Sequence, residues 1–323
     1  MTPPTAFLLV GPTASGKSAV AQCLAEREGR TVVSADSMNV YRGMDVGTAK
    51  PSAKERGHVS YAGIDLVAPS EKFSVAAWLN AVAPVLRGAR PEPVVAGGTG
   101  LYVKCLLDGL SDVPPENAAL RTELEALSLP ELERRALRDA AAAFEALPPS
   151  DRRNPRRLVR ILEKARAGGG ETKNWRTPHR LPHVVGLRLP RDLLWRRIET
   201  RVERMYAGGL LDEAAELLRN ELSPTAGQAI GYAEAFSVLR GERSPEEAKQ
   251  HTVVRTRRLA KRQLTWFRNQ LRVEWIEVDE SDDTETLAAA VAETWRRIGP
   301  SPLRLPPSPR RADPESNAPE TNE

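Results

Sequence analysis

Short apolar runs separated by amphipathic stretches are the dominant pattern along this chain. The apolar runs, bounded by glycine, proline or polar residues, predict buried strands at residues 6–10, 31–34, 93–96, 183–189 and 273–279. The amphipathic stretches predict helices that follow these strands, with examples at residues 19–27, 73–86 and 286–298. Strands that alternate with helices are typical of a parallel sheet flanked by helices, so we predict an α/β fold.

The middle of the chain breaks this alternation. Its pattern is helical and alanine-rich, with interruptions at Pro148-Pro149 and at residues 168–170. We therefore predict a helical insertion domain at residues 116–181, within an α/β core formed by residues 1–115 and 182–298. Apolar residues are scarce after Gly299, so residues 299–323 are predicted to be a disordered tail.

Composition narrows the class of protein but does not define a function. The 323 residues are 41% hydrophobic and 28% charged, as in ordinary folded proteins. The two cysteines, Cys23 and Cys105, lie far apart, so neither a disulfide framework nor a zinc motif is expected. We expect a cytoplasmic protein without a membrane segment, because the chain has neither a long uncharged apolar run nor a signal-peptide pattern. The sequence pI of about 9.2 makes a polyanionic partner worth testing.

The clearest chemical motif directly follows the first predicted strand. It fits the phosphate-binding pattern G-x-x-x-x-G-K-[ST] at every fixed position, as Gly11-Pro12-Thr13-Ala14-Ser15-Gly16-Lys17-Ser18. In this P-loop pattern, main-chain N–H groups and the lysine bind phosphate, and Ser18 supplies a hydroxyl ligand for Mg²⁺. The strand–loop–helix context favours this interpretation over a glycine-rich turn that binds nothing. The loop alone does not distinguish a nucleoside triphosphate from a diphosphate.

Two further segments follow predicted strands. Segment 34–51 contains Asp36, and the glycine-rich segment 97–102 contains Thr99. Because the carboxyl ends of parallel strands line the ligand crevice, Asp36 is a candidate base or metal ligand and Thr99 a candidate phosphate donor. By residue type alone, a cap or turn is the commoner role for an aspartate. The strand before Gly97 lacks the acidic residue with which nucleotide hydrolases hold Mg²⁺, which disfavours a plain ATPase.

Basic side chains gather in the insertion and on two later predicted helices. In the insertion, a cationic helix face suited to phosphates is predicted from the spacing of Arg153, Arg157, Arg160 and Lys164. A solvated helix face explains that spacing equally well.

The first of the two later helices carries an arginine pair. Arg197 and Arg201 share a face and suit a diphosphate, with surface ion pairs to Glu199 or Glu203 as the alternative. The second is residues 251–272, with seven Lys or Arg, no acid and two aromatic residues, and it predicts a helix that can line RNA.

Three segments together carry a family resemblance: GPTASGKS at 11–18, SADSMNVYRGMDVGTAKP at 34–51 and GGTGLYVKCLLDGL at 97–110. With further matches at 121, 154–160, 197–205, 228–232 and 257–267, the chain resembles the tRNA dimethylallyltransferases up to about residue 298. The resemblance implies transfer of a dimethylallyl group from dimethylallyl diphosphate to N6 of adenosine 37, beside the anticodon of tRNAs that read codons beginning with U. It also implies a P-loop of the ATP-binding type, Mg²⁺ as cofactor, and a monomeric enzyme that binds the anticodon stem-loop.

The resemblance and the chemistry of the residues together assign individual roles. Asp36 would take the proton from N6, the 11–18 loop would bind the diphosphate, and Lys17, Thr99 and Arg201 would stabilise its growing charge. The implied tRNA contacts are Asp36, Ser37, Met38, Asn39, Thr99, Arg121, Arg156, Arg157, Leu158, Val159, Arg160, Gln228, Ala229, Ile230, Gly231, Tyr232 and Ala233. The chain departs from the family pattern at Ala233, where Lys or Arg is usual, and at Tyr61-Ala62, where a histidine pair is usual.

Other classes of function remain open at this point. A P-loop kinase for nucleotides or small molecules would explain the loop and the arginines, but not segment 34–51 or the basic helix at 251–272. A free-adenylate prenyltransferase would share the loop and the chemistry without needing a basic insertion. A non-enzymatic RNA-binding protein would have no need of Asp36.

Overall fold

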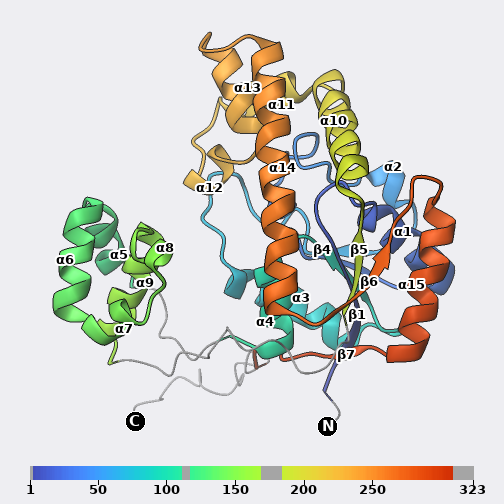
Figure 1. Cartoon of the computed structure of the whole chain (residues 1–323), viewed down its shortest axis with the longest axis horizontal. Helices are drawn as coiled ribbons and strands as arrows, with labels where there is room; N and C mark the ends of the chain where they lie inside the picture. Colours follow the sequence, from blue (N-terminus) through green and yellow to red (C-terminus); the bar gives the residue numbers. More distant parts are fainter. Residues whose placement is uncertain (1–2, 111–116, 169–183, 308–323) are drawn as a thin grey trace, which may run out of the picture. The chain divides into compact units, whose positions relative to one another are not determined.

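The computed structural model describes residues 3–110, 117–168 and 184–307, and these residues include a seven-stranded sheet (Figure 1). The strand order is β3-β2-β4-β1-β5-β6, with β7 beside β1. Neighbours along this path are parallel, whereas β7 pairs antiparallel with β1. The predicted α/β fold with a parallel sheet flanked by helices is therefore confirmed.

The strands are β1 Thr5–Val10, β2 Val32–Ser34, β3 Tyr61–Ala62, β4 Val94–Gly97, β5 Val184–Arg188, β6 Val273–Glu277 and β7 Ser301–Pro302. Every strand that the apolar runs predict is present. The sequence pattern missed β3 and β7. Each has only two residues, too few to produce a periodic signal.

The predicted disordered tail is wrong for the part that the structure describes. Strand β7 pairs with β1, and Leu303 is buried. The N–H groups of Leu303 and Arg304 donate to the carbonyl oxygens of Pro4 and Leu106 at 2.8 and 2.7 Å. One buried leucine and a few main-chain hydrogen bonds order this segment, and composition does not reveal either. Residues 308–323 of that prediction lie outside the described residues.

The helices of the core unit are α1 Lys17–Glu28, α2 Ala53–Arg56, α3 Val75–Gly88, α4 Gly100–Asp108, α10 Arg191–Ala207, α11 Leu210–Leu217, α12 Pro224–Gly227, α13 Tyr232–Leu239, α14 Pro245–Gln270 and α15 Thr284–Ile298. Helices α1 and α15 pack against each other and share an apolar cluster with Leu9 and Val185 of the sheet (Figure 1). Leu8 and Leu9 point to opposite faces and are both fully buried, so helices cover both faces.

Helix α14 begins earlier than the basic pattern suggests. The pattern at residues 251–272 predicts a helix there, and the structure extends it to Pro245–Gln270. Ser244 and Glu247 form a capping box, and Pro245 occupies the first turn. The residues that begin the helix are therefore polar and acidic, and they precede the basic run at residues 251–272.

The chain divides into two compact units, residues 1–109 with 176–323 and residues 110–175. The second unit contains α5 Ala118–Glu125, α6 Leu129–Asp139, α7 Ala141–Glu145, α8 Pro149–Arg152 and α9 Pro155–Arg166. Its core comes from apolar residues on α5, α6, α7 and α9, among them Leu124, Leu132 and Leu158. Residues 116 and 169–181 of the predicted insertion lie outside the described residues.

The predicted cationic face of the insertion loses one member. Arg153 caps the end of α8 and does not belong to α9, which begins at Pro155. The side chain of Asn154 accepts the N–H of Arg156 and so caps α9 at that point. The three- and four-residue spacing therefore places only Arg157, Arg160 and Lys164 on one helix.

Candidate active site

The glycine-rich loop connects β1 to α1 in a conformation suited to an anion. Gly16 (φ 90°) and Ala14 (φ 63°) take up left-handed backbone conformations, which turn successive N–H groups toward a common centre. Ser15 is fully buried, and its Oγ has no hydrogen-bond partner among the described residues. A buried hydroxyl without a partner fits a loop that closes around a ligand oxygen. Ser18, one residue into α1, is exposed.

Lys17, Asp36 and Arg201 meet beside this loop. The Lys17 ammonium donates to the carbonyl oxygen of Pro12 at 3.1 Å. Burial lowers the pKa of Lys17 to about 8; the Asp36 carboxylate opposes this shift and the Arg201 guanidinium adds to it. Burial also lowers the pKa of Arg201, again opposed by Asp36. Two desolvated cations beside one carboxylate make a site that favours an added anion.

Asp36 follows β2 and has the turn role that was weighed from the sequence. Its Oδ1 accepts the N–H of Met38 at 2.9 Å, which closes a turn. Its Oδ2 makes no such bond within the described residues, and the residue is only partly buried. The turn therefore fixes one carboxylate oxygen and leaves the other for a further donor.

Thr99 follows β4 and ties this strand to the Asp36 segment. Its Oγ1 accepts the N–H of Ser37 at 3.0 Å, and its own N–H donates to Ala35 at 3.1 Å. Gly97 lies so close to β2 that an added Cβ would come within 2.1 Å of the Ala35 oxygen. Glycine is therefore required at this crossing, and the ends of β2 and β4 form one unit.

Gln263, on α14, joins two of the loops, and sequence reasoning gave it no role. Its Oε1 accepts the N–H of Thr13 at 2.9 Å, and its Nε2 donates to Gly98 at 3.1 Å. A Cβ on Gly98 would lie 2.4 Å from that Nε2 atom. One amide thus holds the 11–18 loop against the 97–100 loop. The sequence offered only a glutamine within the basic run at residues 251–272.

Helix α10 carries both predicted arginines, one near Thr48 and the other near Gly16. Nη2 of Arg201 donates to the carbonyl oxygen of Thr48 at 2.9 Å. Nη1 of Arg197 lies 3.8 Å from where a Cβ on Gly16 would stand. The acids offered as alternative partners are engaged elsewhere: Glu199 pairs with Arg257, and Glu203 pairs with Lys249.

Half of the residues in the 228–233 segment are buried. Gln228 is exposed and Ile230 and Ala233 are partly buried, whereas Ala229, Gly231 and Tyr232 are buried. The Tyr232 hydroxyl donates to Glu213 on α11. The side chains of this segment that reach the surface are therefore those of Gln228, Ile230 and Ala233.

In the insertion unit, the predicted contacts also divide by burial. Arg156 and Arg157 are exposed, whereas Leu158 and Val159 belong to the core of this unit. Arg121 and Arg160 donate to the buried Glu163 at 3.1 and 2.9 Å, so both help to neutralise that carboxylate. Arg156 and Arg157 are consequently the members of this set whose side chains are most accessible to a partner.

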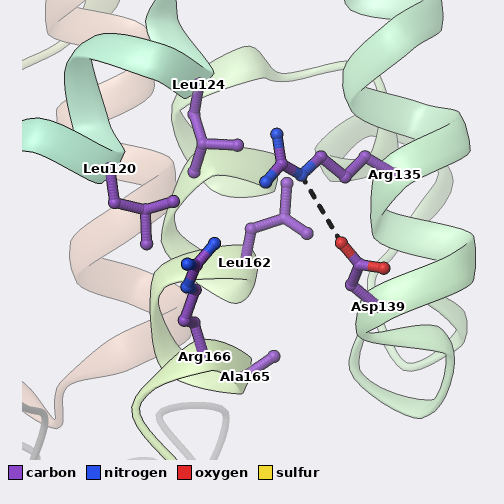
Figure 2. Close-up of a pocket in the computed structure, with 7 residues that line it drawn as sticks. All are labelled: Leu120, Leu124, Arg135, Asp139, Leu162, Ala165 and Arg166. Atoms are coloured by element: carbon purple, nitrogen blue, oxygen red, sulfur yellow. Dashed lines mark ion pairs between the residues drawn. The ribbon is translucent and has the colours of Figure 1, made fainter.

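A cavity of about 150 Å³ also lies within the insertion unit (Figure 2). Its walls are Leu120, Leu124, Arg135, Asp139, Leu162, Ala165 and Arg166. Arg135 and Asp139 form an ion pair at 3.4 Å on one side of it. None of the predicted site residues lines this cavity.

The fold and the site define a class of α/β protein in which a lysine, an arginine and a carboxylate meet beside a glycine-rich strand–loop–helix. Two family models match the chain, and their ranges together contain the residues of this site. One is described as IPP transferase and matches residues 39–270, and the other is described as isopentenyl transferase and matches residues 4–60. The chain belongs to the IPP transferase family and is a prenyltransferase.

Known relatives agree with this assignment. The chain is 42% identical to tRNA dimethylallyltransferase 2 of Geotalea uraniireducens, over 85% of this chain and 93% of the relative. It is 41% identical to the tRNA dimethylallyltransferase of Anaeromyxobacter dehalogenans, over 88% and 96%. The crystal structure of the Bacillus halodurans tRNA isopentenylpyrophosphate transferase matches with a TM-score of 0.64 and 36% identity, over 90% and 96%. In the described ranges, no helix has the length and hydropathy of a membrane span.

Proposed function

We propose that this chain transfers a dimethylallyl group from dimethylallyl diphosphate to N6 of adenosine 37 in tRNAs that read codons beginning with U. The observation that carries the proposal is the meeting of Lys17, Arg201 and Asp36 beside the glycine-rich loop. Two cations suit a departing diphosphate, and one carboxylate suits an amino group that must lose a proton.

In this proposal, the 11–18 loop holds the diphosphate. As the C–O bond breaks, negative charge grows on the leaving oxygen, and Lys17, Arg201 and the Thr99 hydroxyl stabilise it. The buried Ser15 hydroxyl, which has no hydrogen-bond partner in the part of the chain that the structure describes, is a further donor to the same group. The hydroxyl oxygen of Ser18 fits Mg²⁺, a cation that prefers oxygen ligands and that would neutralise diphosphate charge when bound.

The acceptor side of the reaction depends on Asp36. The new C–N bond forms from N6, and the N6 proton passes to the carboxylate oxygen that is not used in the turn with Met38. Adenine inside a stacked anticodon loop cannot reach a partly buried carboxylate. The base is therefore extruded from its stack before it reacts.

The residues proposed to contact tRNA are those that combine the family pattern with exposure. In the core unit they lie on the Asp36–Asn39 segment, at Thr99, and at Gln228, Ile230 and Ala233. In the insertion unit they are Arg156 and Arg157, with Arg121 and Arg160 adding positive charge beside Glu163. Phosphate contacts from arginine supply affinity that does not depend on base sequence.

The test is nucleoside mass analysis of tRNA incubated with the protein, dimethylallyl diphosphate and Mg²⁺. We expect a dimethylallyl adduct on adenosine 37 and none with AMP as acceptor. Modification of AMP alone would favour the free-adenylate prenyltransferase. Robust phosphoryl transfer from ATP to a small molecule, without any adduct on tRNA, would favour the kinase.

Replacing Gln263 by leucine tests whether this amide holds the diphosphate loop. Q263L keeps the volume but removes both hydrogen bonds, each with a net contribution of about 1 kcal/mol. We expect kcat/KM for dimethylallyl diphosphate to fall about tenfold, with tRNA affinity unchanged. The matched control is Q250L, an exposed glutamine on the same helix. Equal kinetics for the two variants would show that the loop keeps its shape without Gln263.

Reversing the charge of Arg157 tests the proposed tRNA surface of the insertion. Arg157 is exposed, and its Nε atom lies 4.0 Å from Oδ2 of Asp151. R157E should weaken tRNA binding and reduce the slope of log affinity against log salt by about one unit. The control is R134E, which changes an exposed arginine on α6. An unchanged slope in R157E would reject the contact.

A further inference from the structure

The loop at residues 44–50 carries the main-chain oxygen that holds Arg201. The carbonyl oxygen of Thr48 accepts from Arg201 Nη2 at 2.9 Å. The buried Lys50 ammonium secures the far end of this loop by donating to the carbonyl oxygen of Tyr41 and to Asp45 Oδ1, both at 2.6 Å. The direction of the Arg201 guanidinium therefore depends on where the loop lies.

Glu213, on α11, fixes the middle of the same loop from outside. Its Oε2 accepts the N–H groups of Asp45 and Val46 at 2.9 and 3.0 Å, and its Oε1 accepts that of Gly47 at 3.3 Å. Three consecutive N–H groups aimed at one carboxylate form an anion-binding nest. Hydrogen bonds to a charged acceptor are about twice as strong as neutral ones, so one side chain sets the path of this backbone.

Tyr232, the first residue of α13, contacts both Glu213 and the 44–50 loop. Its hydroxyl donates to Glu213 Oε1 and accepts the N–H of Gly47 at 3.2 Å. A Cβ on Gly47 would lie 2.4 Å from the tyrosine ring, so the backbone rests directly on the ring. Burial and the Glu213 carboxylate raise the pKa of Tyr232 far above its ordinary value, which keeps the hydroxyl protonated. A fully buried side chain with these partners presents no edge to an RNA.

We propose that Glu213 and Tyr232 are positioning residues for the leaving group. They hold the 44–50 loop in place, so that the carbonyl oxygen of Thr48 orients the Arg201 guanidinium toward the diphosphate. The inference rests on the proposed function, because it takes Arg201 to bind that group. It also gives Tyr232, which the family resemblance places among the tRNA contacts, a role inside the protein.

The test separates positioning from a merely structural role by measuring the two substrates independently. In E213Q, an amide nitrogen replaces one carboxylate oxygen of Glu213. This nitrogen cannot accept hydrogen bonds from the N–H groups of the loop. We expect KM for dimethylallyl diphosphate to rise about tenfold and tRNA affinity to remain unchanged. Y232F, which keeps the ring under Gly47, should give a smaller rise. E216Q, an exposed acid one turn further along α11, is the matched control and should behave as the parent protein.

A double-mutant cycle decides whether the effect passes through Arg201. If it does, E213Q added to R201Q should raise KM for dimethylallyl diphosphate by less than twofold, because the oriented group is already gone. Independent, multiplying effects would overturn the proposal, as would weaker tRNA binding in Y232F with diphosphate binding intact. If the parent protein itself does not bind dimethylallyl diphosphate, the proposed function fails first, and the variants are not needed to show it.

Discussion

Asp36→Asn is expected to abolish most prenyl transfer while leaving both substrates bound. The asparagine Oδ1 can still accept the N–H of Met38, so the turn after β2 is retained. The amide cannot take a proton from N6, and the loss of a general base lowers rates by roughly 10²- to 10⁴-fold. We therefore expect the single-turnover rate to fall about a thousandfold, with the Kd values for tRNA and dimethylallyl diphosphate within a factor of three.

The measurement is the single-turnover rate of adduct formation on an anticodon stem-loop, with binding measured separately. Asp192→Asn, an exposed aspartate at the start of α10, is the control for loss of one carboxylate. A D36N variant that transfers at the parent rate would show that the proton leaves to water after the C–N bond has formed. That result would remove Asp36 as the base but keep the loop as the diphosphate site.

The sequence predicted those parts of the site that follow strands. Residues at the carboxyl ends of adjacent parallel strands meet at one edge of the sheet, so Lys17, Asp36 and Thr99 were assigned from short local patterns. Gln263 and Glu213 could not be assigned in this way. Gln263 bonds to Thr13 across 250 positions of the chain, and Glu213 bonds to Val46 across 167. No local periodicity records such a contact.

Burial was the second property that the sequence left undetermined. The family pattern names a run of neighbouring residues without separating those that face outward from those that face the core. On α9, Arg157 is exposed and Leu158 is fully buried. Side chains one position apart on a helix point about 100° apart, so a continuous run of contacts on one surface is not possible. Tyr232 is likewise part of a family run, and its side chain is fully buried.

Lys17→Met is expected to have the second-largest effect, on the diphosphate rather than on tRNA. Lys17 is buried in the loop and bonds to Pro12, so the cation is already desolvated before the ligand arrives. A preorganised donor at a growing charge contributes roughly 10²- to 10³-fold to the rate. We expect kcat/KM for dimethylallyl diphosphate to fall at least a hundredfold and tRNA affinity to stay constant. Lys17→Arg keeps the charge and should recover part of the loss.

The pH dependence of binding provides an independent check on Lys17. Its pKa is about 8, below the ordinary 10.5, because burial disfavours the charged form. Between these values the unfolded chain binds more protons, so the folded protein gains stability as pH rises from 8 toward 10.5. A bound anion favours the charged lysine and raises its pKa, so binding above pH 8 requires proton uptake.

In metal-free buffer, the affinity for dimethylallyl diphosphate should therefore be level between about pH 7 and pH 8 and then fall about tenfold per pH unit. The ligand's own charge does not change there, since its terminal phosphate is fully ionised well below pH 8. Lys17→Arg should flatten this profile, because a guanidinium keeps its proton throughout the range. A parent profile that stays level to pH 10 would mean that Lys17 does not contact the bound diphosphate, and the loop would then bind it through main-chain N–H groups and Arg201 alone.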